Sequence, residues 1–220
     1  MKKIIALLVL ALFMTGCNQT TDFGGEIVQD FPTEPIVATV GDTTFSVGVS
    51  VGNTYRNAFV GLRCALDDKW TLLTDEEIRM ENISSLGIAA ENYAQSISSA
   101  PILYDMMANH GNGQDTVCVV MEKADAAKLQ LTEEAYLTAS KDSAVSSVES
   151  LGITVSSAEI TKIQFADAEH YVLKIHGRFT GYNVYEYLVA LKCDGYIAVV
   201  TACTWDIDTC LDVLNQFKSY

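Results

Sequence analysis

The sequence predicts an α+β domain with an antiparallel sheet of about six to seven strands, flanked by helices. Residues 160–204 hold four alternating apolar segments joined by short turns, the pattern of a strand meander. Helix-start signals stand at Thr74 and Thr132, each followed by a periodic apolar pattern. Runs of strands separated by single long helices favour α+β over a repeated strand–helix–strand unit.

The first half of the domain should contain short strands followed by a helix and a hairpin. Apolar and polar residues alternate over 45–66, and Trp70 follows a polar turn. Thr74 and Glu77 have the spacing of a capping box, so a helix should begin there and run, with an irregularity near Ser84–Gly87, towards Gln95. A hairpin is expected over 102–123, with its turn at Gly111-Asn112-Gly113.

In the second half, a helix capped by Thr132 should end at Gly152. The expected meander strands are Ile160–Phe165, Glu169–Phe179, Val184–Lys192 and Tyr196–Thr204. Asp194-Gly195 predicts a two-residue turn between the last two, which places Leu191 opposite Ala198 and Cys203 opposite Glu186. An amphipathic helix from Ile207 to Phe217, capped by Asp206, should follow.

The N-terminus has the pattern of a bacterial export signal. Lys2 and Lys3 precede an apolar run from Ile4 to Met14, which is too short for the roughly 20 apolar residues of a bilayer span. Met14-Thr15-Gly16-Cys17 resembles the lipobox of bacterial lipoproteins, in which the cysteine is acylated and becomes the first residue. We therefore expect a signal peptide over 1–16 and a lipid anchor on Cys17.

Residues 17–42 are expected to form the lipidated cysteine and a flexible tether, and residues 43–220 a single α+β domain. Most of the prolines lie in the tether region, which shows no sustained periodicity. This organisation places the domain at the cell membrane on the extracytoplasmic side.

The charge of the chain argues against a nucleic-acid partner. The formal net charge is −14, and removal of Lys2 and Lys3 with the signal makes it −16. A polyanion is not attracted to nucleic acid or to anionic lipid, so membrane attachment must come from acyl chains.

Five cysteines follow Cys17, and their spacing supports neither a zinc site nor a redox site. The odd number leaves at least one thiol free. Cys203 and Cys210 are close enough in sequence for a local disulfide, and the sequence leaves that pairing open. Neither a metal nor a cofactor is expected.

Several short matches identify a family resemblance. They are Tyr55-x-Asn57, Gly61-Leu62, Trp70 and Glu76-Glu77-Ile78, within the order hairpin, helix, meander and closing helix. This arrangement resembles the PsbP-like/DcrB-like α/β/α sandwich over about residues 43–220. The resemblance implies an antiparallel sheet with helices on its faces, and accessory or binding roles more often than catalysis.

Two catalytic patterns have simpler explanations. Gly48-Val49-Ser50-Val51-Gly52 fits G-x-S-x-G, but a strand pattern follows it where a nucleophile elbow requires a helix. His170 and His176 lie six residues apart on one strand, about 20 Å, and cannot bind one metal. We therefore predict that the protein is not an enzyme, with a hydrolase acting through Ser50 as a remote alternative.

An aromatic cluster provides the positive hypothesis for a partner surface. Tyr182, Tyr185, Tyr196 and Trp205 lie around the last two hairpins, and such residues are enriched at recognition surfaces. Packing of these side chains within the sheet is the competing interpretation. The sequence thus predicts a membrane-anchored accessory or protein-binding domain, with a solute-binding or sensing lipoprotein as the alternative.

Overall fold

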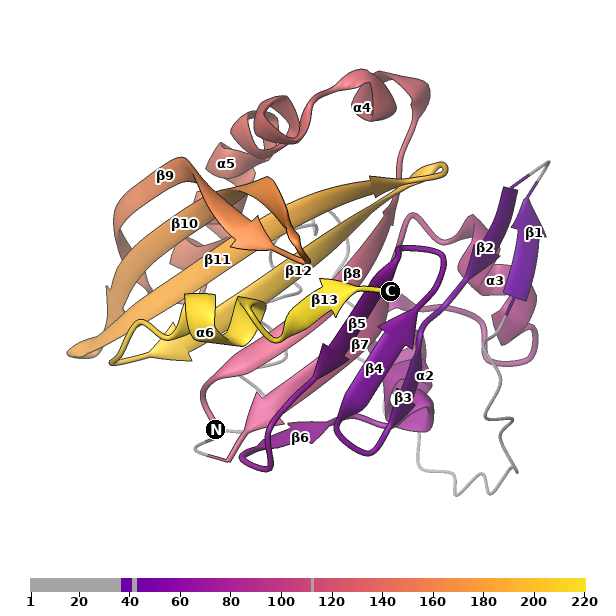
Figure 1. The fold of residues 1–220 in the computed structure, drawn as a ribbon, viewed down its shortest axis with the longest axis horizontal. Helices are drawn as coiled ribbons and strands as arrows, with labels where there is room; N and C mark the ends of the chain where they lie inside the picture. Colours follow the sequence, from indigo (N-terminus) through magenta and orange to yellow (C-terminus); the bar gives the residue numbers. More distant parts are fainter. Residues whose placement is uncertain (1–36, 41–42, 112) are drawn as a thin grey trace.

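The computed structural model describes residues 37–40, 43–111 and 113–220 (Figure 1). The strands before the first described helix are β1 (Val37–Val40), β2 (Thr43–Ser46), β3 (Val49–Val51), β4 (Thr54–Asn57), β5 (Leu62–Ala65) and β6 (Trp70–Leu72). The middle of the chain forms α2 (Asp75–Leu86), α3 (Tyr93–Ser99), β7 (Ile102–His110), β8 (Thr116–Lys123), α4 (Ala126–Gln130) and α5 (Glu133–Ser150). The last elements are β9 (Thr154–Phe165), β10 (Ala168–Phe179), β11 (Tyr182–Cys193), β12 (Tyr196–Trp205), α6 (Cys210–Leu214) and β13 (Phe217–Ser219).

The main sheet is antiparallel and has seven strands in the order β6-β7-β8-β12-β11-β10-β9. This confirms the predicted fold class and the four-strand meander. The register set by the Asp-Gly turn is also confirmed, since Leu191 pairs with Ala198 and Cys203 with Glu186. The first meander strand begins at Thr154, six residues before the predicted start.

A second sheet of four strands, in the order β13-β5-β4-β3, packs in front of the main sheet (Figure 1). A third pairing joins β1 to β2, so Val37–Val40, within the range expected to be tether, form a strand.

The predicted closing helix is largely wrong. Only Cys210–Leu214 are helical, Ile207 before them is 71% exposed, and Phe217 belongs to β13. Phe217 is fully buried, because β13 places its ring in the core between the two sheets.

The two predicted helix starts are confirmed, but one helix is shorter than expected. The Thr74 side chain accepts from the Glu77 amide while the Glu77 carboxylate accepts from the Thr74 amide, which completes the capping box. The Thr132 hydroxyl accepts from the Ala135 amide in the same way. Gly87 adopts a left-handed conformation with φ of 66° and ends α2 well before Gln95.

The two faces of the main sheet are covered differently. One face packs against the four-stranded sheet, α3 and α6 in the largest apolar cluster, which includes Tyr55, Val200 and Phe217. On the other face α5 covers β9, β10 and β11, and α2 covers β7, so two smaller clusters form there. Within the part of the chain that the structure describes, no helix has the length and apolar character of a membrane span.

A single buried carboxylate joins the two sheets. Asp105 lies at a bulge in β7, where the register shifts between Tyr104 and Met106. Its carboxylate accepts from the Gly48 amide at 2.7 Å, from the Asn57 side-chain amide at 2.7 Å and from the Tyr55 hydroxyl. Burial raises the pKa of Asp105, while all three donors favour its charged form. Tyr55 and Asn57 lie on β4 and Gly48 directly precedes β3, so Asp105 fixes the β3–β4 hairpin against β7.

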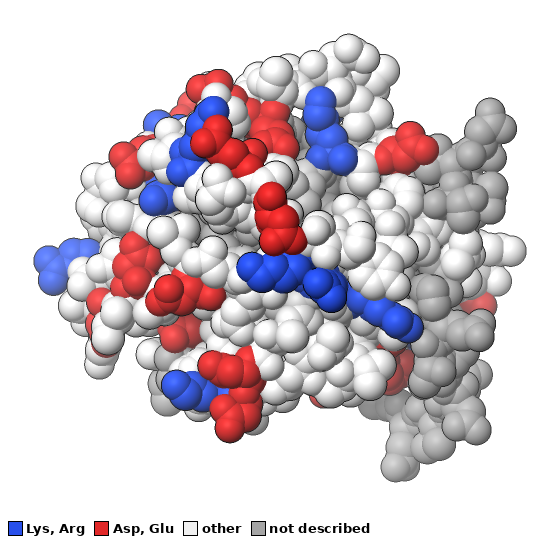
Figure 2. Space-filling model, viewed as in Figure 1, with Lys and Arg blue, Asp and Glu red and all other residues white. Residues whose placement is uncertain are grey.

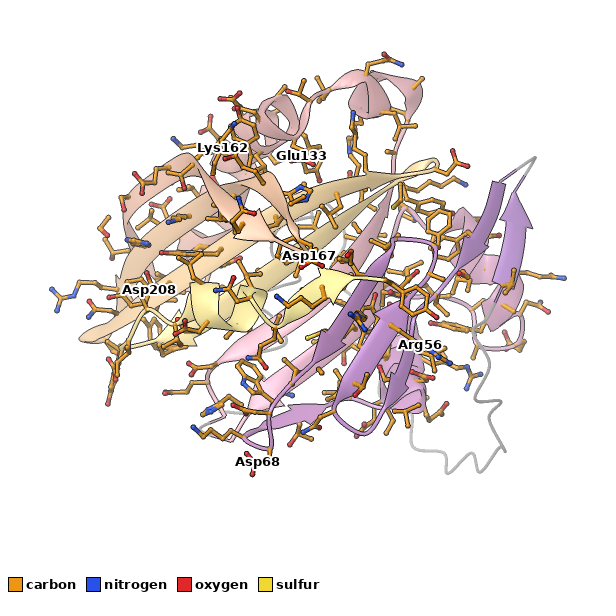
Figure 3. The ribbon with its side chains drawn as sticks, viewed as in Figure 1. Arg56, Asp68, Glu133, Lys162, Asp167 and Asp208 are labelled. Carbon is orange, nitrogen blue, oxygen red and sulfur yellow. The ribbon has the colours of Figure 1, made fainter. Side chains whose placement is uncertain are left out.

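We expect Asp105→Ala to lower the free energy of unfolding by about 3 kcal/mol or more, because it leaves three buried donors without an acceptor. Urea unfolding followed by circular dichroism measures this loss. Asp68→Ala is the matched control, since Asp68 is exposed and lies in a turn of the small-sheet side (Figure 3). The control should change stability by less than about 0.5 kcal/mol. Equal behaviour of the two variants would contradict the role assigned to Asp105.

Candidate functional site

The four aromatic residues predicted as a partner surface do not share one face. Tyr196 is only 3% exposed and stacks on Phe45 with 4.5 Å between ring centroids. Tyr185 packs against the cluster on the face of the four-stranded sheet, and Trp205 against the cluster on the α5 face. Tyr182 is 48% exposed at the start of β11. The hypothesis of one surface formed by all four is therefore wrong, because successive residues of a strand alternate between faces.

Two further large apolar side chains are exposed near the end of the sheet that carries Tyr182, and the sequence did not indicate their exposure. The Asp206 amide donates to the Asn183 carbonyl, which brings Ile207 to the same end of the sheet as Tyr182. Ile207 and Leu211 are 71% and 38% exposed. We call Tyr182, Ile207 and Leu211 the end surface. The helical spacing of Ile207 and Leu211 suggested burial, but Ile207 lies before α6 and Leu211 lies on its exposed side.

Acidic side chains lie next to Ile207 and Leu211 along the chain. Asp206, Asp208 and Asp212 are exposed along the loop into α6 and on α6 itself. Figure 3 labels Asp208 at this end of the molecule, and Figure 2 shows acidic groups gathered there. The Asp208 carboxylate also accepts from the Tyr187 hydroxyl at 2.5 Å, which holds the loop on β11. An apolar patch with an acidic rim suits a partner segment that carries both apolar and basic side chains.

The G-x-S-x-G sequence has a structural explanation. A Cβ at Gly48 would lie 2.3 Å from the Tyr55 ring and 3.0 Å from Asp105, so only glycine permits the contact with that carboxylate. Gly52 has φ of 58° in the turn between β3 and β4. Ser50 lies on β3, and its amide donates to the Asp75 carboxylate at 2.8 Å. A strand follows the serine, so the geometry of a nucleophile elbow is absent.

The histidines lie on separate structures. The His170 ring contacts the Glu133 carboxylate at 3.0 Å, and the His176 ring contacts the Tyr187 hydroxyl at 3.3 Å. Both histidines lie on β10 of the main sheet, whereas Ser50 lies on β3 of the four-stranded sheet. Among the described residues, no group of three His, Cys, Asp or Glu side chains could hold a metal ion.

All five cysteines after Cys17 are free thiols. Cys203 packs on the α5 face of the main sheet and Cys210 on the opposite face, so the sheet separates the pair that sequence spacing left open. Burial raises the pKa of Cys64, Cys118 and Cys210 to about 12. Thiols of this kind are unreactive near neutral pH. Cys17 lies outside the described residues.

Glu186 on β11 is a buried carboxylate of a different kind from Asp105. It is 2% exposed, and neither of its oxygens has a hydrogen-bond partner. Burial raises the pKa of Glu186 to about 8. Its signal in the sequence is a single acidic residue on the apolar face of a strand, between Val184 and Leu188.

We expect the protein to lose stability as the pH rises from about 4.5 to about 8. Over this range the folded chain holds a proton on Glu186 that the unfolded chain releases, so deprotonation favours unfolding. Glu186→Gln removes this contribution, and its free energy of unfolding should exceed that of the wild type by up to about 4 kcal/mol at pH 8.5, the difference vanishing near pH 4. Urea unfolding at several pH values measures this difference. Glu149→Gln, at an exposed position of α5, should follow the wild type.

The comparisons with known proteins include a likeness to a solved structure. No family model matches the chain, and no curated protein matches it. The crystal structure of LpqN of Mycobacterium tuberculosis, described as involved in cell envelope biogenesis, is similar over 84% of this chain and 90% of that chain, with 10% identity and a TM-score of 0.40. The resemblance to the PsbP-like sandwich stays a prediction, and the proposals below rest on the residues of this chain.

Proposed function

We propose that the protein is a lipid-anchored lipoprotein of the cell envelope, and that its α+β domain binds another envelope or surface protein without catalysing a reaction. The lipid anchor is supported by the sequence from Lys2 to Cys17, which has a basic start, a short apolar run and a Thr-Gly-Cys ending. Acylation of Cys17 would hold the domain at the outer side of the membrane.

The end surface supports the binding role. Tyr182, Ile207 and Leu211 are large apolar side chains exposed near one end of the sheet, and exposed apolar side chains of this size are common at interaction sites. The neighbouring aspartates favour a partner segment with Lys or Arg side chains, which the acidic chain would attract from a distance. Catalysis has no comparable support, because the Ser50 motif serves the contact with Asp105 and the β3–β4 turn.

The anchor is tested by Cys17→Ala in cells. We expect the variant to leave the membrane fraction or to accumulate as unprocessed precursor, because it has no thiol to acylate. Fractionation and mass spectrometry of the N-terminus give the readout, with Cys64→Ala as the matched cysteine control. An unchanged membrane fraction for Cys17→Ala would contradict the anchor.

The binding role is tested by crosslinking of the anchored protein in cells, followed by identification of the captured proteins. We expect one recurrent envelope protein, whose capture falls at least fivefold in Ile207→Ser or Tyr182→Ala. The melting temperature of these variants should stay within about 2 °C of the wild type, because exposed side chains contribute little to stability.

Val51→Ser provides the control for this experiment, since Val51 is 67% exposed on β3, in the other sheet. It should capture the partner as well as the wild type. Capture that is unaffected at Ile207 and Tyr182, or lost equally in Val51→Ser, would overturn the role of the end surface.

A further inference from the structure

Three basic residues form one row across the outer face of the four-stranded sheet. Arg63 on β5 pairs with Arg56 on β4 and, on its other side, with Lys218 on β13. Residues paired in this way lie on the same face of a sheet, and all three side chains are exposed. Figure 2 shows basic groups in a continuous band across the front of the molecule, and Figure 3 labels Arg56 there. We call Arg56, Arg63 and Lys218 the basic row.

The arrangement of the basic row is unfavourable for the protein alone. Like charges directly opposite each other on neighbouring strands destabilise a sheet. The Leu66 amide donates to the Asn53 carbonyl, so Arg56 and Arg63 form a non-hydrogen-bonded pair, in which facing side chains lie closest. Since neighbouring strands are about 4.8 Å apart, the three backbone positions span only about 10 Å. An anion bound at the row would relieve this repulsion.

Acidic side chains of the protein compensate little of this charge. The salt bridges among the described residues involve other side chains than the three of the basic row. Arg63 donates to the Ser219 backbone carbonyl at 3.1 Å, which leaves its positive charge in place. The pKa of Asp167 is lowered chiefly by hydrogen bonds from Ser219 and further by Lys218 and Arg63. One neighbouring carboxylate therefore stands against three cations.

The basic row contrasts with the charge of the whole chain. The sequence has 28 acidic and 14 basic residues, and its formal net charge is −14. The net charge opposes attraction of the whole molecule to an anionic surface. Exposed charges separated by more than about 8 Å are, however, largely screened at physiological ionic strength. An anionic group at the basic row is therefore attracted by the three nearby cations more than it is repelled by distant carboxylates.

The chemistry around the basic row favours phospholipid headgroups. Guanidinium groups such as those of Arg56 and Arg63 can bind phosphate oxygens through two parallel hydrogen bonds. The Tyr220 amide donates to the Gly61 carbonyl, which continues the pairing of β13 with β5 and places Tyr220 on the same side as Lys218. Tyr220 is 62% exposed, and tyrosine is enriched where lipid meets water. Cations beside an exposed tyrosine favour a membrane surface over a soluble polyanion.

We propose that the basic row docks the domain onto anionic phospholipid headgroups of the membrane that carries it. Arg56 and Arg63 donate to headgroup phosphates, Lys218 adds a third positive charge, and the outer face of the four-stranded sheet lies against the bilayer. This inference rests on the proposed membrane location and adds an orientation to it. The acyl chain on Cys17 holds the domain near the membrane, and the basic row determines which face points towards the lipid.

The test is co-sedimentation of the full chain with lipid vesicles. Cys17→Ala serves as the parent, so that no acyl chain contributes, and the other N-terminal residues are the same in every variant. We expect tighter binding to mixed phosphatidylcholine and phosphatidylglycerol vesicles than to phosphatidylcholine alone. Adding Arg56→Gln should weaken binding to the mixed vesicles about fivefold, the effect of one basic residue near an anionic surface. Arg56→Gln with Lys218→Gln should weaken it about twentyfold.

Arg178→Gln provides the matched control. Arg178 is exposed on β10 of the main sheet, so its removal changes the net charge equally and leaves the basic row intact. This variant should bind the mixed vesicles as the parent does. High salt should remove the preference for the mixed vesicles, because it screens exposed charges. Circular dichroism establishes that each variant is folded.

Several results would overturn the proposal. Equal binding of the parent to both kinds of vesicle, or binding unchanged by Arg56→Gln and Lys218→Gln, would exclude docking through the row. An equal loss in Arg178→Gln would show that net charge governs the binding. Tighter binding of soluble polyphosphate than of mixed vesicles, lost in Arg56→Gln, would assign the row to a soluble polyanion. None of these results bears on the Cys17 anchor, which cell fractionation tests separately.

Discussion

The contact on which the rest of the structure depends is the one between the Asp105 carboxylate and three donors of the small sheet. A sheet of seven strands can bury one face under helices, but its other face here requires a second sheet. Apolar packing holds two sheets together without fixing how they are aligned. The bulge at Asp105 turns one polar side chain into that interface, and the Gly48, Tyr55 and Asn57 donors fit it in only one arrangement. The alignment of the sheets is thus set by hydrogen bonds inside an apolar core.

Two buried carboxylates of the molecule, Asp105 and Glu186, differ in their hydrogen-bond partners. Asp105 accepts three hydrogen bonds on its two oxygens, so it acts as a structural group. Glu186 has the same burial and no donor, although a glutamate is no harder to satisfy than an aspartate. Burial raises the pKa of Glu186 to about 8, so near neutral pH the carboxyl is mostly protonated and the core holds a neutral group in place of a buried charge.

Local signals in the sequence predicted much of the fold. The Asp194-Gly195 turn and the capping box at Thr74 each act within a few residues, so the hairpin register and the start of α2 could be inferred correctly. The four-stranded sheet could not, because β13 joins β5 across most of the chain and three residues give no recognisable strand pattern. The apolar spacing of Ile207, Leu211 and Phe217 fits a helix equally well, and it is the pairing of β13 that decides against it. For the site, a lone acidic residue on an apolar strand face was visible at Glu186, whereas the exposure of Ile207 followed from tertiary structure.

The pairing of β13 with β5 has a consequence for how the chain reaches its folded state. Phe217 pairs with Cys64 and the Ser219 carbonyl accepts from the Arg63 side chain, 156 residues earlier in the sequence. The edge of the small sheet therefore stays open until the residues around 217–219 are available, and closing so long a loop is slow. The pairing of β13 with β5 is therefore the contact that completes the small sheet.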